Sequence, residues 1–175
     1  YKREKGIDHP DTVLAKKYAL RATEATLLLM HISGRGDGFV ARTYMVPTEP
    51  VPDDGLFYKK MGDKAVVLPT TGAKQRGIAG KEIYAGAPIP ERLSHLYTDL
   101  GYSHDGIVYK GDTSSDEIIG HLFLYKLAYD ILSEEDPQLG QLIVNAVEKF
   151  AQHIVDNSYC LVDGSGQPTT WGKFS

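Results

Sequence analysis

The chain has few of the features that would narrow its function at once. Its single cysteine, Cys160, excludes an intrachain disulfide and any metal site built from several cysteines. Apolar runs are short, as in Leu27–Met30, and none approaches the roughly 18 residues that a membrane span needs. Positively charged residues are not in excess either, because the chain has 19 Lys and Arg and 23 Asp and Glu. Since phosphate binding needs clustered cations, this balance argues against nucleic acid as the main partner.

What is present is an ordinary globular composition. The 175 residues are 42% hydrophobic and 24% charged, which is enough for one domain, residues 1–175, with its own core. The chain begins at Tyr1 rather than Met, so we expect a fragment of a longer protein, from which a signal peptide would be missing. A periplasmic or secreted location fits this expectation, but the sequence leaves the location and the oligomeric state open.

Three long helices are predicted from apolar periodicity. The first covers residues 11–32. The second covers residues 115–132, with Ser114 or Ser115 as its N-cap, and its apolar side chains lie nearly all round, which predicts burial on every side. The third covers residues 137–157 and has one apolar face. The short link between the last two predicts an antiparallel hairpin of an inner and an outer helix.

The segment between the first and second helices is rich in Gly and Pro. It contains short β-like runs at Ala65–Leu68 and Gly106–Tyr109 and a short helical pattern near residues 91–100. A second β-hairpin is expected at residues 159–164, around the Asp-Gly turn. The fold class predicted from these patterns is mainly α, with a long loop and short β-hairpin insertion.

Two motifs carry most of the unusual chemistry. One is the acid-rich stretch His104–His121, which runs into the second helix, and the other is DGSGQPTTWGKF at residues 163–174. Together with Tyr159–Val162 they resemble a group of poorly characterised bacterial proteins that are similar to six-hairpin (α/α)-toroid glycosidases. The resemblance spans mainly residues 100–175, with weaker support at residues 38–44. It implies part or all of an (α/α) toroid built of helical hairpins, and a carbohydrate ligand.

The candidate catalytic residues are the carboxylates of Asp112, Asp116 and Glu117, with His121 one helical turn beyond Glu117. Hydrolysis of a glycosidic bond commonly uses two carboxylates, one as the acid and one as the base or nucleophile. Asp116 and Glu117 point about 100° apart on a helix, so another acid would have to complete the pair. The competing interpretation is structural, because acids in a first turn are stabilised by the helix terminus.

The candidate substrate-binding residues are aromatic or charged, and four of the six lie in the same acid-rich stretch. Aromatic rings suit the apolar faces of sugars, and Lys and Arg suit acidic sugars. The residues selected are His104, Asp105, Tyr109, Lys110, Arg42 and Trp171. No cofactor or metal site is predicted, because a single Glu–His pair is far from a complete set of ligands.

Three functions remain open from the sequence. The first is a glycoside hydrolase acting on a polysaccharide or oligosaccharide. The second is a polysaccharide lyase on the same fold, in which Tyr109, His104 and His121 would take part in proton abstraction. The third is a non-catalytic glycan-binding or structural domain. The hypotheses differ in whether at least two of the carboxylates converge in a deep cleft.

Overall fold

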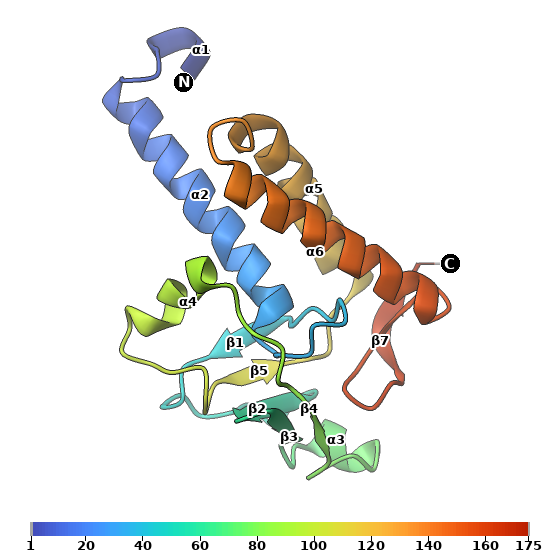
Figure 1. The fold of residues 1–175 in the computed structure, drawn as a ribbon. Helices are drawn as coiled ribbons and strands as arrows, with labels where there is room; N and C mark the ends of the chain where they lie inside the picture. Colours follow the sequence, from blue (N-terminus) through green and yellow to red (C-terminus); the bar gives the residue numbers. More distant parts are fainter. Residues whose placement is uncertain (1, 175) are drawn as a thin grey trace.

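In the computed structural model, which describes residues 2–174, three long helices stand over an antiparallel sheet (Figure 1). The helices are α1 (Lys2–Lys5), α2 (Pro10–His31), α3 (Thr71–Gln75), α4 (Glu91–Thr98), α5 (Ser115–Leu132) and α6 (Pro137–Asp156). The strands are β1 (Thr43–Met45), β2 (Phe57–Met61), β3 (Lys64–Val67), β4 (Glu82–Tyr84), β5 (Val108–Lys110), β6 (Cys160–Val162) and β7 (Pro168–Lys173). The three predicted long helices and the C-terminal hairpin are therefore confirmed.

Local capping explains where α5 and α6 begin. The Ser114 hydroxyl accepts a hydrogen bond from the Glu117 backbone N–H, while the Glu117 carboxylate accepts one from the Ser114 N–H at 2.9 Å. This reciprocal capping box satisfies two amides that a helix N-terminus leaves unpaired. Before α6, the Asp136 carboxylate accepts from the Leu139 N–H at 3.0 Å, and Pro137 takes the first helical position. Both starts are encoded within a few residues.

The sheet has the strand order β1-β5-β2-β3-β4, and every pairing is antiparallel. A tight turn at Gly62, with φ +63°, joins β2 to β3. Strand β5 comes from far along the chain and inserts between β1 and β2, so that Tyr109 is opposite Tyr44 on one side and Tyr58 on the other. This insertion carries the acid-rich stretch from the sheet directly to the start of α5.

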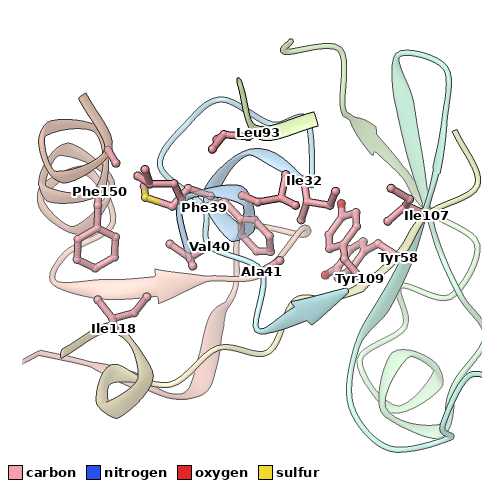
Figure 2. Packing of buried hydrophobic residues seen from close by; sticks show 14 of the residues in the cluster. Ile32, Phe39, Val40, Ala41, Tyr58, Leu93, Ile107, Tyr109, Ile118 and Phe150 are labelled. Atoms are coloured by element: carbon pink, nitrogen blue, oxygen red, sulfur yellow. The ribbon is translucent and has the colours of Figure 1, made fainter. Parts of the chain in front are cut away.

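The core fills the space between the sheet and the helices. Figure 2 shows the side chains that meet there: the end of α2, the segment that follows it, the central strands and the facing sides of α5 and α6. Tyr58 and Tyr109 stack with their ring centroids 5.2 Å apart, and Phe39 contacts Tyr109 edge-on at 6.2 Å. Such aromatic geometries add to the free energy gained from burying the rings.

The predicted (α/α) toroid is wrong. The segment expected to be a loop and hairpin insertion forms a five-stranded sheet, so the fold is mixed α and β. The error has a clear cause: strands of three to five residues carry little periodic signal, and their partners lie far away in sequence. The α5–α6 hairpin, which suggested a ring of hairpins, packs against α2 and the C-terminal hairpin β6–β7 instead (Figure 1).

The predicted burial of α5 on every side is also wrong. Its buried side chains are Ile118, Tyr125, Ala128 and Leu132, which face the core. Its opposite face exposes Ile119, Phe123, Leu127 and Ile131. In contrast, α6 buries a single stripe, as its pattern predicted. Among residues 2–174, none of the helices combines the length and the apolarity needed to cross a bilayer.

Candidate functional site

The loop that leads from β5 into α5 is held rigidly from both sides. The buried Thr113 hydroxyl donates to the Val40 carbonyl at 2.6 Å, and the Thr169 hydroxyl donates to the Thr113 carbonyl at 2.9 Å. At Gly111 a Cβ would lie 2.5 Å from the Tyr58 ring, so only glycine fits there. The side chains that follow Thr113 are therefore positioned by Val40, in the segment between α2 and β1, and by Thr169 of β7.

Three of the predicted site residues come together at this point. The Arg42 guanidinium forms an ion pair with the Glu117 carboxylate at 2.8 Å and lies 3.5 Å from the Asp112 carbonyl, to which it donates. The Asp112 carboxylate is 3.5 Å from the Thr170 backbone N–H of β7. Arg42, Asp112 and Glu117 thus form a polar cluster in which Glu117 also caps α5.

Trp171 follows Thr170 in the same strand and is 72% exposed. The backbone of its neighbour contacts Asp112, so Trp171 lies one position along β7 from a residue that contacts the polar cluster. A large aromatic side chain that remains in water is available for stacking with a ligand. We call the four residues Arg42, Asp112, Glu117 and Trp171 the α5-start surface.

The remaining two predicted catalytic residues do not join this surface as a catalytic pair. Asp116 is exposed in the first turn of α5. His121 is half-buried, its Nδ1 has no hydrogen-bond partner, and its ring contacts Tyr125 edge-on at 6.2 Å. Burial lowers the pKa of His121, and the nearby Glu117 opposes this effect only in part. The neutral form of the His121 imidazole is therefore favoured.

Four further predicted binding residues lie elsewhere or are inaccessible. Tyr109 is buried in the core, where burial raises its pKa strongly, so it offers no platform for a sugar. His104 is bonded through Nε2 to the Ile32 carbonyl at 2.7 Å, and burial lowers its pKa. Asp105 accepts from the Gly62 N–H at 2.9 Å, at the β2–β3 turn. Lys110 forms an ion pair with Asp54 at 3.0 Å.

Three hollows in the described surface lie away from the acids. An apolar groove of about 290 Å³ runs between α5 and α6. An open polar pocket of about 650 Å³ is lined by Glu24, Arg92 and His95, between α2 and α4. A third, of about 540 Å³, lies at the β2–β3 turn beside Asp105. None of these three hollows is lined by Asp112, Asp116 or Glu117.

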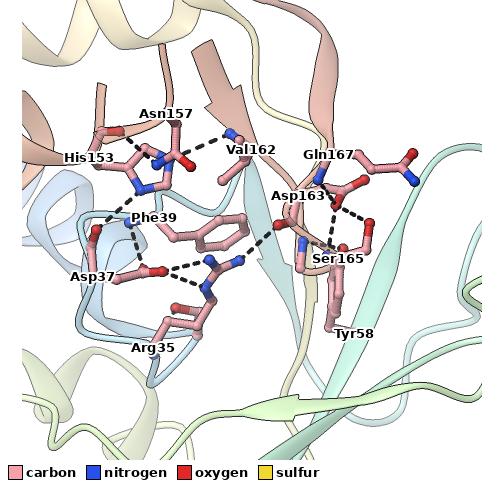
Figure 3. Close-up of polar contacts among 12 residues, drawn as sticks. Arg35, Asp37, Phe39, Tyr58, His153, Asn157, Val162, Asp163, Ser165 and Gln167 are labelled. Carbon is pink, nitrogen blue, oxygen red and sulfur yellow. Dashed lines mark hydrogen bonds and ion pairs between the residues drawn. The ribbon is translucent and has the colours of Figure 1, made fainter. Parts of the chain in front are cut away.

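A polar network that sequence reasoning missed joins the turn after α2 to the C-terminal hairpin (Figure 3). The Arg35 guanidinium bonds the Asp37 carboxylate at 2.5 Å and the Asp163 carbonyl at 3.1 Å. His153 is buried, with Nδ1 3.1 Å from the Asp37 carbonyl and Nε2 accepting from the Val162 N–H. The paired Arg35 holds the pKa of Asp37 below its usual range against the opposing effect of burial.

Asp163 is the centre of the second half of this network and is 0% exposed. One carboxylate oxygen pairs with Arg76 at 2.8 Å. The other accepts from the N–H groups of Ser165 and Gln167 and from the Ser165 hydroxyl. A fully satisfied buried carboxylate of this kind fixes the β6–β7 turn. The network therefore holds together segments that are about 90 to 130 residues apart and positions β7, which carries Trp171.

The sequence contained one signal for this network, in the glycines at positions 34, 36 and 38. All three have positive φ, from +67° to +83°, and these sharp turns flank Arg35, which reaches the Asp163 carbonyl in the C-terminal hairpin. Within residues 2–174, no three His, Cys, Asp or Glu side chains gather in a group that could hold a metal ion. No family model, curated protein or solved structure matches this chain.

Proposed function

We propose that this domain binds a glycan on the α5-start surface without cleaving it. The observation that carries the proposal is the exposed Trp171, whose neighbour in β7, Thr170, contacts Asp112 of the polar cluster. A flat indole stacks on the apolar face of a sugar ring, while carboxylates and a guanidinium bond its hydroxyl groups. The rigid β7 and the capped α5 keep these groups in place before a ligand arrives, which reduces the entropy lost on binding.

The geometry favours binding over hydrolysis. The Glu117 carboxylate already accepts from the Ser114 N–H and pairs with Arg42, so both interactions would have to be given up for it to serve as a general acid. Hydrolases place two carboxylates on either side of the scissile bond. Here Asp116 is exposed in the first turn of α5, and none of the three hollows described above is lined by these acids.

Lyase chemistry is disfavoured for a different reason. It would need a tyrosine or histidine in contact with the sugar, and the Tyr109 ring is sealed in the core against Tyr58. His104 and His121 are each half-buried on different elements, and His104 is bonded to the Ile32 carbonyl. These positions leave no exposed base next to the α5-start surface.

The test is a screen of the protein against an array of polysaccharides and oligosaccharides, followed by calorimetry on any ligand found. Trp171→Ala should weaken binding by about five- to thirtyfold, since loss of an aromatic stacking platform removes on the order of 1–2 kcal/mol. Tyr84→Ala is the matched control, because Tyr84 is a similarly exposed aromatic residue on the far strand β4. That variant should bind as the wild type does.

Product analysis on the same ligands separates the three functions. Unchanged glycan after long incubation supports the proposal. New reducing ends that disappear in Glu117→Gln would instead establish a hydrolase, and unsaturated uronide products would establish a lyase. Equal binding by Trp171→Ala and the wild type would refute the placement of the glycan site at the α5-start surface.

A further inference from the structure

The exposed face of α5 carries an unpartnered apolar stripe. Its exposed fractions are 59% for Ile119, 68% for Phe123, 42% for Leu127 and 62% for Ile131. These residues are spaced at every fourth position, so they follow one another along one side of the helix, opposite the side that faces the core. The groove between α5 and α6 runs along the same helix, lined by Leu122, Tyr125, Val144 and Val147 among others.

We propose that this stripe is the interface of a homodimer in which two α5 helices pack antiparallel. The sequence of the stripe is symmetric about position 125. In an antiparallel pair with that centre, Ile119 is opposite Ile131 of the other copy, and Phe123 is opposite its Leu127. Every large apolar side chain then meets another, which is the self-complementarity that a two-fold interface requires.

Gly120 supports a close approach of the second helix. It lies in the second turn of α5, on the side of the stripe, and a Cβ there would have no neighbour within 4 Å. Nothing in the described chain therefore requires glycine at this position, although glycine costs about 1 kcal/mol in a helix interior. Small residues at helix contacts allow backbones to approach closely, and the antiparallel arrangement also opposes the two helix dipoles favourably.

The size of the stripe predicts a weak dimer. Its four side chains expose on the order of 400 Å² of apolar surface, at the level where a patch on a monomer usually marks an interaction site. A standard stable interface buries about 800 Å² per partner, so the stripe and its polar margins give an interface near the lower limit. Asp116 would lie opposite Glu134 of the other copy at the ends, which weakens the pairing at low salt.

Sedimentation velocity between about 1 and 300 µM tests the proposal. The wild type should shift from monomer to dimer over this range, and the shift should begin at lower concentration when salt is raised. Phe123→Asp should remain monomeric throughout, with an unchanged circular dichroism spectrum because Phe123 lies outside the core. Tyr84→Asp, which places the same charge on an equally exposed aromatic position of β4, should dimerise as the wild type does.

Cross-linking tests the register. In a Cys160→Ser background, a mixture of Phe123→Cys and Leu127→Cys chains should form disulfide-linked heterodimers at least several-fold faster than either variant alone. A wild type that stays monomeric at 300 µM overturns the proposal, as does a dimer that Phe123→Asp leaves intact. Preferential linking of Phe123→Cys to itself would overturn the antiparallel register.

Discussion

Asp163 offers the sharpest test of what holds the C-terminal hairpin in place. Its carboxylate is fully buried, pairs with Arg76 at 2.8 Å and accepts three further hydrogen bonds from Ser165 and Gln167. Asp163→Asn keeps the oxygen that accepts those three bonds and removes the ion pair. Asp163→Ala removes all four interactions. The difference between the two variants therefore separates the ion pair from the turn.

The expected loss of unfolding free energy depends on how deeply Asp163 and Arg76 are each buried. Breaking a buried ion pair costs about 3–5 kcal/mol, but Arg76 keeps partial access to water and can recover part of its hydration. We therefore expect Asp163→Asn to lower the free energy of unfolding by about 2 kcal/mol. Asp163→Ala should lower it by about 4 kcal/mol, because the turn amides also lose their acceptor. Against a typical total of about 5–15 kcal/mol, both losses are easily measured.

Urea unfolding followed by circular dichroism at 222 nm gives these free energies, provided that the dependence on urea concentration is unchanged. Asp54→Asn is the matched control, since it also removes an aspartate from an ion pair, but its carboxylate is exposed to solvent. That variant should unfold as the wild type does, because exposed ion pairs contribute little. If Asp163→Asn were as stable as Asp54→Asn, the network around Asp163 would not be what anchors β7.

Two further predictions concern the end of α2 and the turn that follows it. Burial, aided by Lys149, lowers the pKa of His31 from 6.5 to about 4. Between these two pKa values the unfolded chain binds a proton at His31 and the folded protein does not. The free energy of unfolding should therefore fall by up to about 3 kcal/mol as the pH drops from 6.5 to 4. Urea titrations at pH 7 and pH 4.5 should show a smaller fall in this free energy for His31→Gln than for the wild type. At Gly38, φ is +83° and a Cβ would lie 2.2 Å from the Lys149 carbonyl oxygen, so Gly38→Ala should destabilise by about 3 kcal/mol. Gly101→Ala shares the positive φ but has open space, and an equal loss in both thermal melts would contradict the steric argument.

Local sequence was sufficient for the long helices because their signals lie within a few residues. Ser114 and Glu117 encode the start of α5, and Pro137 with Asp136 encodes the start of α6. The apolar period of 3.6 residues also gave the buried face of α6 correctly. The same kind of pattern predicted, wrongly, that α5 is buried on every side. An apolar side chain indicates a preference for burial, but the sequence does not show whether another segment covers it.

The candidate site could be predicted from sequence only in part. Glu117 and Asp112 were selected from the acid-rich stretch, and Trp171 from its aromatic character, but nothing local indicated that Arg42 would pair with Glu117. That contact joins residues 75 positions apart and exists because β5 inserts between β1 and β2. Tyr109 shows the opposite case, since the same insertion buries a tyrosine that was expected to face a ligand.

The sequence by itself determined the elements whose hydrogen bonds are local: three long helices with their caps and a C-terminal hairpin. Only the tertiary structure decided that these helices stand over a five-stranded sheet rather than in a ring. It also decided which charges meet and which apolar side chains remain in water. The physical reason is that strand pairing and side-chain burial are settled between distant segments, and the cost of bringing such segments together cannot be read from either segment alone.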